Sequence, residues 1–115
     1  MLTLTSTAQP SKQLQVTAFA KGITLPTTQV IDVRTPQEYA AGHIPNAILA
    51  NWNSTTDFAA AIQVLDKAKP IYLYCQLGGR SAKALAWLTS KGYKQVYELQ
   101  GGLTAWLQAG KPLAK

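Results

Sequence analysis

Residues 70–92 read PIYLYCQLGGRSAKALAWLTSKG, and this stretch decides the fold. Its first part, Ile71–Tyr74, is rich in β-branched and aromatic side chains, which favours a buried strand. Its last part, Ser81–Lys91, carries apolar residues at helical spacing and predicts a helix. The glycine-containing segment Cys75–Arg80 joins the two as a loop. A strand, a loop and a helix in this order form the repeating unit of an α/β protein.

The same alternation extends outward in both directions. Further strands are expected at Leu14–Val16, Val30–Val33, Ile48–Ala50 and Val96–Leu99, and further helices near Thr17–Lys21, from Pro36 up to Gly42, over residues 58–65 and after Gly101-Gly102. This pattern predicts an α/β fold with a central parallel sheet of about four to five strands, helices on both faces and right-handed crossovers. Residues 13–115 are expected to form this one domain, and residues 1–12 a flexible N-terminal tail.

The helix that follows the second strand has a start and a stop in the sequence. Thr35 is expected to cap it, Pro36 suits its first position, and Glu38 completes a capping box with Thr35. Gly42 is expected to end the helix in a left-handed cap.

Composition favours a globular domain and excludes two classes of protein. The 115 residues are 47% hydrophobic and 14% charged, which fits neither a disordered chain nor one that crosses a membrane. The first residues lack the basic start and the continuous apolar run of a signal peptide, so we expect a cytoplasmic location. The net charge is +6, but the basic residues are scattered, so we expect a solvated surface and no nucleic-acid partner.

Cys75 is the only cysteine of the chain. A disulfide within the chain, a zinc site built on a pair of cysteines and a dithiol redox motif are therefore all excluded. Without a resolving thiol, any group that Cys75 picks up must pass to a different molecule.

The loop around this cysteine is suited to hold it as a thiolate. Gly78 and Gly79 permit a tight turn whose N–H groups point inward, and the following helix adds free N–H groups at its start. Both effects lower the pKa of Cys75, and the thiolate is the nucleophilic form. Arg80 offers a permanent cation for an anionic substrate, and Ser81 is placed to cap the helix. A lone cysteine is often a buried apolar residue. A cysteine of that kind needs no glycine turn, no following arginine and no helix start beside it.

Three groups of residues then match a known family in the right order. They are Ile31-Asp32-Val33-Arg34 with Glu38-Tyr39 and Gly42-His43-Ile44-Pro45-Asn46-Ala47; Tyr74-Cys75 with Gly78, Arg80 and Ser81; and Gly101-Gly102 with Trp106 and Gly110-Lys111-Pro112. In this combination the chain resembles the rhodanese-like domains. The resemblance implies a sulfurtransferase that moves a sulfane sulfur from thiosulfate or a related persulfide donor, through a Cys75 persulfide, to cyanide or a thiol, including a protein thiol. It implies no metal and no other cofactor.

The resemblance also assigns roles to residues. Cys75 is the expected nucleophile, and the rest of the loop is expected to bind the persulfide and the anionic donor: Gln76, Leu77, Gly78, Gly79, Arg80 and Ser81. Asp32 and Arg34 are expected to support this region from the second strand, with Arg34 able to pair with Glu38. We expect the single histidine, His43, to have a structural hydrogen-bonding role.

Two other functions stay open. One is a non-enzymatic module that uses the fold to bind a partner, although such relatives often lack the cysteine that is present here. The other is a phosphatase-like or arsenate-reductase-like thiolate enzyme. Tyrosine phosphatases have five residues between cysteine and arginine, whereas four separate Cys75 from Arg80. The shorter loop should suit one sulfur atom better than a phosphate. Gln76 stands where some thiosulfate-using relatives have a basic residue, which leaves the donor open.

Overall fold

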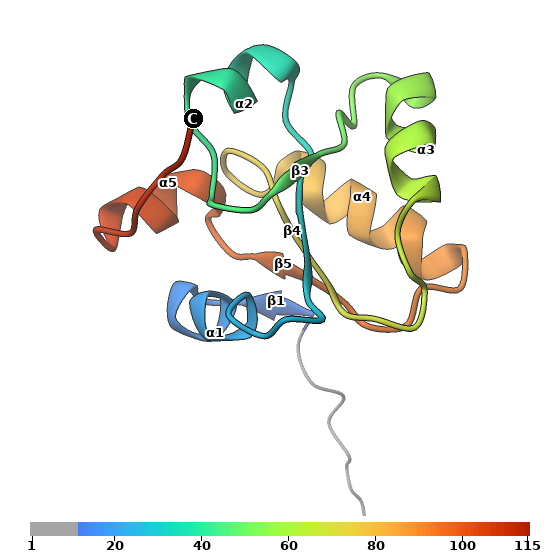
Figure 1. The fold of residues 1–115 in the computed structure, drawn as a ribbon, viewed down its shortest axis with the longest axis horizontal. Helices are drawn as coiled ribbons and strands as arrows, with labels where there is room; N and C mark the ends of the chain where they lie inside the picture. Colours follow the sequence, from blue (N-terminus) through green and yellow to red (C-terminus); the bar gives the residue numbers. More distant parts are fainter. Residues whose placement is uncertain (1–11) are drawn as a thin grey trace, which may run out of the picture.

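A computed structural model describes residues 12–115 and shows a sheet of five parallel strands within them. The strands are β1 (Gln13–Leu14), β2 (Gln29–Asp32), β3 (Ile48–Leu49), β4 (Ile71–Tyr74) and β5 (Val96–Leu99). They lie in the order β1-β5-β4-β2-β3, and every neighbouring pair is parallel (Figure 1). The predicted α/β class is confirmed, and β4 takes the centre of the sheet. The predicted N-terminal tail lies outside the described residues, apart from Lys12.

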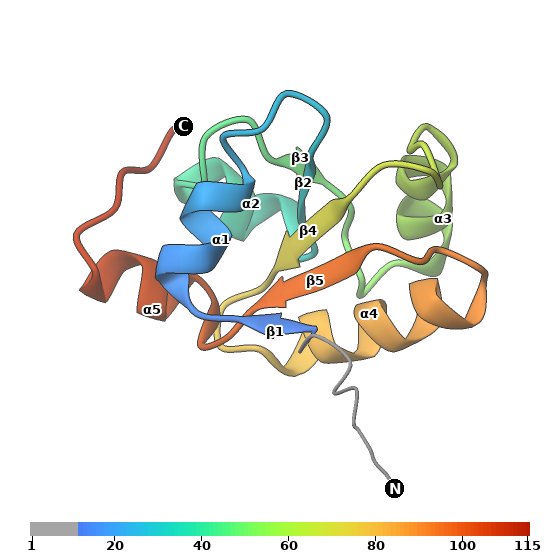
Figure 2. The same cartoon turned by 90° about the horizontal axis from the view of Figure 1, so that it is seen from below.

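Five helices within residues 12–115 cover both faces of the sheet (Figure 2). They are α1 (Val16–Gly22), α2 (Pro36–Ala41), α3 (Thr55–Gln63), α4 (Gly79–Ser90) and α5 (Gly102–Gln108). On one face, Phe58 of α3 and Leu88 of α4 pack in a core that includes Leu73. On the other, Phe19 of α1 and Trp106 of α5 pack in a second core. The expectation of helices on both faces is therefore confirmed.

Strand β4 is buried from both sides, which explains its unbroken apolar sequence. Because side chains alternate along a strand, Ile71 and Leu73 join the core under α3 and α4, whereas Tyr72 and Tyr74 face the core under α1 and α5. Tyr74 is paired in register with Asp32 of β2. The C-terminal ends of β2 and β4 thus lie side by side, and so do the segments that follow them.

The start of α2 confirms the predicted capping box. The Glu38 N–H donates to Thr35 Oγ1 at 3.2 Å, and the Thr35 N–H donates to Glu38 Oε1 at 3.1 Å. The end of α2 differs from the prediction, because Gly42 has φ 150° and ψ 137° and does not form a left-handed helical cap. The chain leaves α2 in an extended conformation because His43 pairs with Ala114 in an antiparallel bridge.

Other helix and strand bounds also differ from the prediction. Helix α4 begins at Gly79, because Gly78 (φ 123°) already makes the turn. Ser81 consequently lies inside the first turn, and the expectation that it caps the helix is wrong. Strand β1 covers only Gln13–Leu14, since residue 16 already belongs to α1. Helix α3 starts earlier than expected because Ser54 caps it, and it ends at Gln63, two residues earlier than expected.

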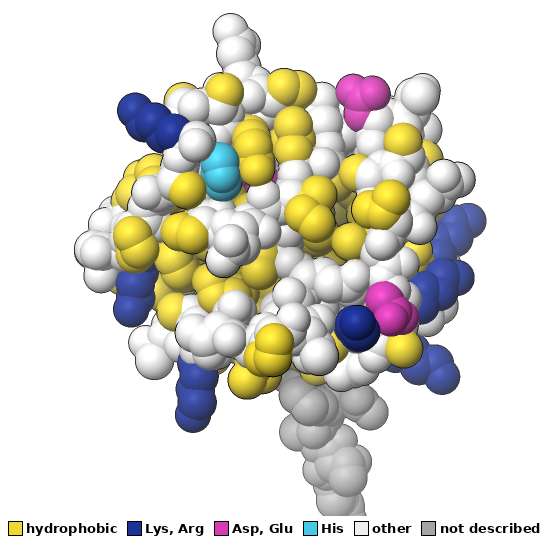
Figure 3. Space-filling view, viewed as in Figure 1, with side chains coloured by type: hydrophobic (Ala, Val, Ile, Leu, Met, Phe, Trp, Pro, Cys, Tyr) yellow, Lys and Arg dark blue, Asp and Glu magenta, His cyan; other side chains and the backbone are white. Residues whose placement is uncertain are grey.

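The face seen in Figure 1 carries most of its Lys and Arg side chains around the rim, and hydrophobic side chains gather between α1 and α5 (Figure 3). A groove of about 450 Å³ at this place is lined in part by Ala20, Ile23, Pro45, Trp106 and Pro112.

Within residues 12–115, no helix is long and apolar enough to span a bilayer.

Helix α5 begins against the loop that follows β4. The Leu103 N–H donates to the Cys75 carbonyl at 2.9 Å, and the Thr104 N–H donates to the Gln76 carbonyl at 3.2 Å. This approach needs glycine at the start of the helix. A Cβ on Gly102 would lie 2.6 Å from the Cys75 carbonyl oxygen and 2.5 Å from that of Gln76, and Gly102 has φ +58°.

We expect Gly102→Ala to destabilise the fold by about 2–4 kcal/mol, because it adds a steric clash to an unfavourable backbone conformation. Gly79→Ala is the matched control, since a Cβ there would meet no atom within 4 Å and would lie in a helix. It should leave stability unchanged or raise it by up to about 1 kcal/mol. Urea denaturation measures both, and equal stabilities for the two variants would contradict the close approach.

Candidate functional site

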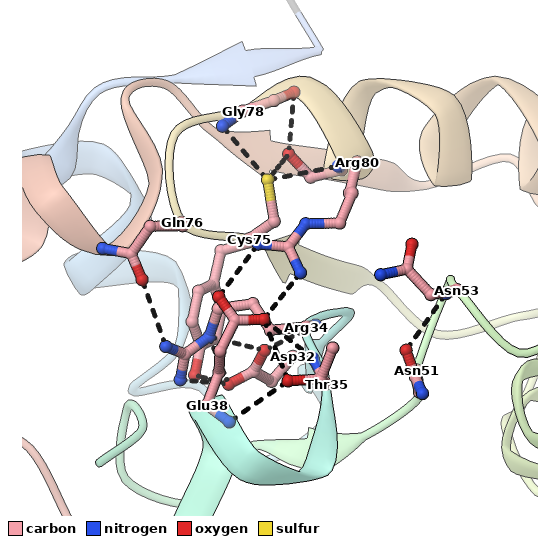
Figure 4. Close-up of polar contacts among 12 residues, drawn as sticks. Asp32, Arg34, Thr35, Glu38, Asn51, Asn53, Cys75, Gln76, Gly78 and Arg80 are labelled. Carbon is pink, nitrogen blue, oxygen red and sulfur yellow. Dashed lines mark hydrogen bonds and ion pairs between the residues drawn. The ribbon is translucent and has the colours of Figure 1, made fainter. Parts of the chain in front are cut away.

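Cys75 lies directly after β4, at the C-terminal edge of the sheet, where parallel sheets place their ligand sites. Its side chain points into the loop, and only 1% of the residue is exposed. The Gly78 N–H donates to Sγ at 3.1 Å, and the Ser81 N–H donates to it at 3.4 Å (Figure 4). The Ser81 hydroxyl oxygen lies 3.5 Å from Sγ. The sulfur is therefore buried, but among hydrogen-bond donors.

Burial by itself raises the pKa of Cys75, yet the pKa lies below its ordinary value. Hydrogen bonds from the Ser81 hydroxyl and from the N–H groups of Ser81, Gly78 and Leu77 outweigh burial. Each of them stabilises the charged form. Among residues 12–115, no histidine forms a hydrogen bond with the sulfur. The loop itself thus favours the nucleophilic thiolate.

The predicted loop residues take different positions around this sulfur. Gly78 and Ser81 contact it directly, and Gly78 does so from a positive φ that disfavours other residues. Leu77 contributes its N–H, while its residue is 70% exposed. Gly79 opens α4. The Gln76 side chain bonds to other partners, Arg34 and Thr104, so its contact with a substrate stays a prediction.

Arg80 is held by Glu38 of α2. Its Nη1 donates to Glu38 Oε1 at 2.7 Å, and its Nη2 donates to Oε2 at 3.0 Å. This two-point contact lowers the pKa of Glu38 to about 2. The pairing of Arg34 with Glu38 that the sequence suggested is wrong, because the order of the strands brings α4 against α2. An anion that binds Arg80 must share it with Glu38.

Arg34 instead forms a buried ion pair with Asp32. Its Nη2 lies 2.8 Å from Asp32 Oδ2, and Nε donates to both carboxylate oxygens. Asp32 also accepts the Tyr74 hydroxyl at 2.7 Å, and Arg34 donates to the Gln76 amide oxygen at 3.3 Å. The pair thus connects β2 to the end of β4 and to the loop, and the supporting role expected for both residues stays a prediction.

His43, the single histidine, forms none of the site contacts described above. The His43 ring stacks on Tyr39 at 3.8 Å, and its Nδ1 lies 3.0 Å from the Tyr39 carbonyl oxygen. Trp52 lines a groove of about 260 Å³ with Phe58 and Trp87. No group of three His, Cys, Asp or Glu side chains that could ligate a metal ion is found in residues 12–115.

Glu98 of β5 is a site residue that sequence reasoning missed. It is 3% exposed and accepts the Ser81 hydroxyl at 2.6 Å, and the oxygen of this hydroxyl lies 3.5 Å from the Cys75 sulfur. The available signal was a carboxylate inside the otherwise apolar strand Val96–Leu99. The contact of Glu38 with Arg80 was also missed, and no signal in the sequence pointed to it, because the two residues are 42 positions apart.

The Arg80–Glu38 pair makes stability depend on pH. The pKa of Glu38 falls from 4.5 to about 2 on folding, so the pair stabilises the fold above the higher value and loses this effect as pH falls towards the lower one. Glu38→Gln keeps a residue that suits the capping box but cannot ionise. At pH 7 it should cost about 1 kcal/mol or less, because the pair is partly exposed.

Denaturation of both proteins between pH 7 and pH 2 checks this, with the difference expected to shrink below about pH 5. A difference that stays constant down to pH 2 would contradict the proposed origin.

Comparison with known proteins identifies the family. A family model described as the rhodanese-like domain matches residues 15–109. A protein from Allochromatium vinosum named Sulfurtransferase is 34% identical over 84 residues, covering 73% of this chain and 76% of the relative. A protein from Pseudomonas paraeruginosa named Thiosulfate sulfurtransferase GlpE is 38% identical over 78 residues, covering 68% of each.

Solved structures agree with this result. The crystal structure of a rhodanese-related protein from Thermoplasma volcanium matches with a TM-score of 0.77 and 25% identity, covering 89% of this chain and 96% of that one. The solution structure of the rhodanese-like domain of a protein from Anabaena matches with a TM-score of 0.80 and 29% identity, covering 91% and 80%. The two relatives reported above are named as sulfurtransferases. The sequence and the fold of this chain both show that it belongs to the rhodanese-like domain family.

Proposed function

We propose that this protein is a sulfurtransferase that carries a sulfane sulfur on Cys75 as a persulfide. The observation that supports this most is the hydrogen bonding of the Gly78 and Ser81 N–H groups to the Cys75 sulfur. These groups stabilise a negative charge on a sulfur atom inside the loop. The names of the related sulfurtransferases agree with this chemistry.

The reaction proceeds in two displacements. The Cys75 thiolate attacks the terminal sulfur of the donor, the S–S bond of that sulfur breaks, and the leaving group departs with the electron pair, as sulfite when the donor is thiosulfate. Cys75 then carries a persulfide anion. An acceptor, cyanide or a thiolate, attacks the outer sulfur, takes it up as thiocyanate or as a new persulfide, and releases the Cys75 thiolate. Neither displacement needs an external oxidant or reductant.

The burial of Cys75 limits which electrophiles can react. With 1% of the residue exposed, a donor must present the reacting atom at its end. The terminal sulfur of thiosulfate or of a persulfide meets this condition. A phosphate or arsenate would have to bring a tetrahedral centre to the same place, and the four-residue spacing to Arg80 leaves a smaller loop for it. These arguments favour sulfur transfer over the phosphatase-like alternative.

The charges around the site influence which sulfur donors can bind. The Arg80 guanidinium is already engaged by Glu38, and Arg34 by Asp32. A dianion such as thiosulfate therefore meets no unpaired guanidinium at the loop, and we propose that a persulfide of lower charge, including one on a protein thiol, can serve as well as thiosulfate. A reducing compartment such as the cytoplasm suits this chemistry, because the single cysteine must remain a thiol.

Loading with thiosulfate tests the proposed function. We expect a mass increase of one sulfur atom, and thiocyanate once cyanide is added, with both lost in Cys75→Ser because a hydroxyl does not form the persulfide. Circular dichroism of the variant controls for folding. Sulfur loading of Cys75→Ser would contradict the assignment of the nucleophile. Phosphate ester hydrolysis without sulfur loading would favour the phosphatase-like alternative, and no chemistry with either substrate would favour a binding module.

Glu38→Gln tests how charge selects the donor. Loss of the carboxylate frees Arg80, so we expect loading from thiosulfate to rise about two- to fivefold, the factor that an exposed ion pair of up to about 1 kcal/mol allows. Loading from cysteine persulfide, which carries less negative charge, should change less. Stopped-flow rates for both donors provide the measurement, and an equal change for the two would contradict an effect of donor charge.

A further inference from the structure

A groove between α3 and α4 takes no part in the proposed reaction. The two helices lie on the same face of the sheet, where Phe58 and Leu88 share one core (Figure 2). One part of the groove, of about 260 Å³, reaches Trp52 after β3, and a second part, of about 330 Å³, reaches Lys91 at the end of α4. Ala59 and Trp87 line both parts, so the two adjoin. Together they form the α3–α4 groove.

The walls of the α3–α4 groove are largely apolar. The Phe58 ring stands nearly perpendicular to the rings of Trp52 and Trp87, with centroid distances of 4.9 and 5.5 Å. Lining residues recur at helical spacing along α3 from Thr55 to Gln63, which makes the groove about 12 Å long. A long, narrow apolar surface of this kind fits a straight hydrocarbon chain.

The second part of the groove carries two cations. Lys67 Nζ lies 5.1 Å from the centroid of the Tyr93 ring, and Lys91 Nζ lies 5.6 Å from that of Trp87. The Lys67 ammonium also donates to the Lys91 carbonyl at 3.2 Å, which keeps the two lysines together. Neither forms an ion pair within residues 12–115, and no Asp or Glu of these residues lines the groove. An anion would therefore meet two cations that no carboxylate neutralises.

Tyr93 adds an unused hydrogen-bond donor at the same end. It lines the groove and is 8% exposed, and its hydroxyl has no hydrogen-bond partner within the described part of the chain. Buried tyrosine hydroxyls usually have a partner, as those of Tyr39 and Tyr74 do here. A group that only accepts hydrogen bonds, such as a carboxylate, would supply the missing partner.

We propose that the α3–α4 groove binds a straight-chain carboxylate of medium length. The carboxylate accepts hydrogen bonds from Lys67, Lys91 and the Tyr93 hydroxyl. The hydrocarbon chain lies against Trp87 and extends towards Trp52, where its burial stabilises the complex. A peptide is disfavoured as the occupant, because the apolar walls would leave its backbone N–H and C=O groups without partners.

This site is separate from the sulfur. Trp87 lies seven residues beyond Arg80 on α4, which is about 10 Å along the helix axis. No residue of the loop Cys75–Arg80 lines the groove. Carboxylate binding can therefore be measured without sulfur transfer, and it does not depend on the proposed function.

Titration with decanoate tests the proposal, with tryptophan fluorescence as the signal, since two of the three tryptophans line the groove. We expect saturable binding of one molecule below the concentration at which decanoate forms micelles, and equilibrium dialysis checks the stoichiometry. Ala59→Phe fills the groove and should weaken binding about tenfold or more, because the ring and the ligand cannot occupy the same volume. Ala60→Phe is the matched control. Both alanines are exposed on α3, but Ala60 does not line the groove, so this variant should bind normally.

The role of charge is tested by replacing both cations. The double variant Lys67→Gln with Lys91→Gln should weaken decanoate binding about five- to tenfold, since each exposed ion pair contributes modestly. Its affinity for decanol, which has the same chain without the charge, should stay the same. Lys69→Gln is the control, because Lys69 lies outside the groove and pairs with Asp66.

Any of three results would overturn the proposal: no saturable decanoate binding to the wild-type protein, equal affinities of Ala59→Phe and Ala60→Phe, or equal binding of decanoate and decanol to the wild-type protein. Loss of decanoate binding in folded Cys75→Ser would also overturn it, since that result would place the ligand at the loop after β4.

Discussion

The site depends on two backbone N–H groups, those of Gly78 and Ser81, that point at the Cys75 sulfur. Burial opposes ionisation of the sulfur, and these donors, with the Leu77 N–H and the Ser81 hydroxyl, reverse that effect. The pKa of Cys75 therefore depends on the balance between two opposite contributions, burial and hydrogen bonding. Because each donor is positioned by the turn into α4, the loop conformation itself lowers the pKa of Cys75.

The loop keeps this conformation because other elements hold it from outside. The carbonyls of Cys75 and Gln76 accept N–H groups from the start of α5, which approaches closely through Gly102. A peptide unit is planar, so fixing the Gln76 carbonyl also restricts the direction of the Leu77 N–H, which is one of the donors to the sulfur. The Arg80–Glu38 pair braces the loop from α2. The fold thus holds the donors in place before any substrate arrives.

The sequence predicted what is local. The Thr35–Glu38 capping box, the strand before Cys75 and the turn at Gly78 each depend on residues within a few positions of one another. The partner of Glu38 and the place of Glu98 could not be predicted in this way. Both depend on β4 lying between β2 and β5, and the sequence contains no direct signal for that order. A carboxylate in an apolar strand did mark Glu98 as unusual, but not its neighbour.

The strand order has a chemical consequence. It places Glu38, which follows β2, and Glu98, in β5, on opposite sides of the sulfur that follows β4. Arg80 balances the first carboxylate, so amide dipoles rather than an unpaired cation favour the thiolate. A Cys75 persulfide, the intermediate that we propose, would carry the same single charge as the thiolate that it replaces. The same N–H groups would then stabilise the negative charge before and after the proposed uptake of sulfur.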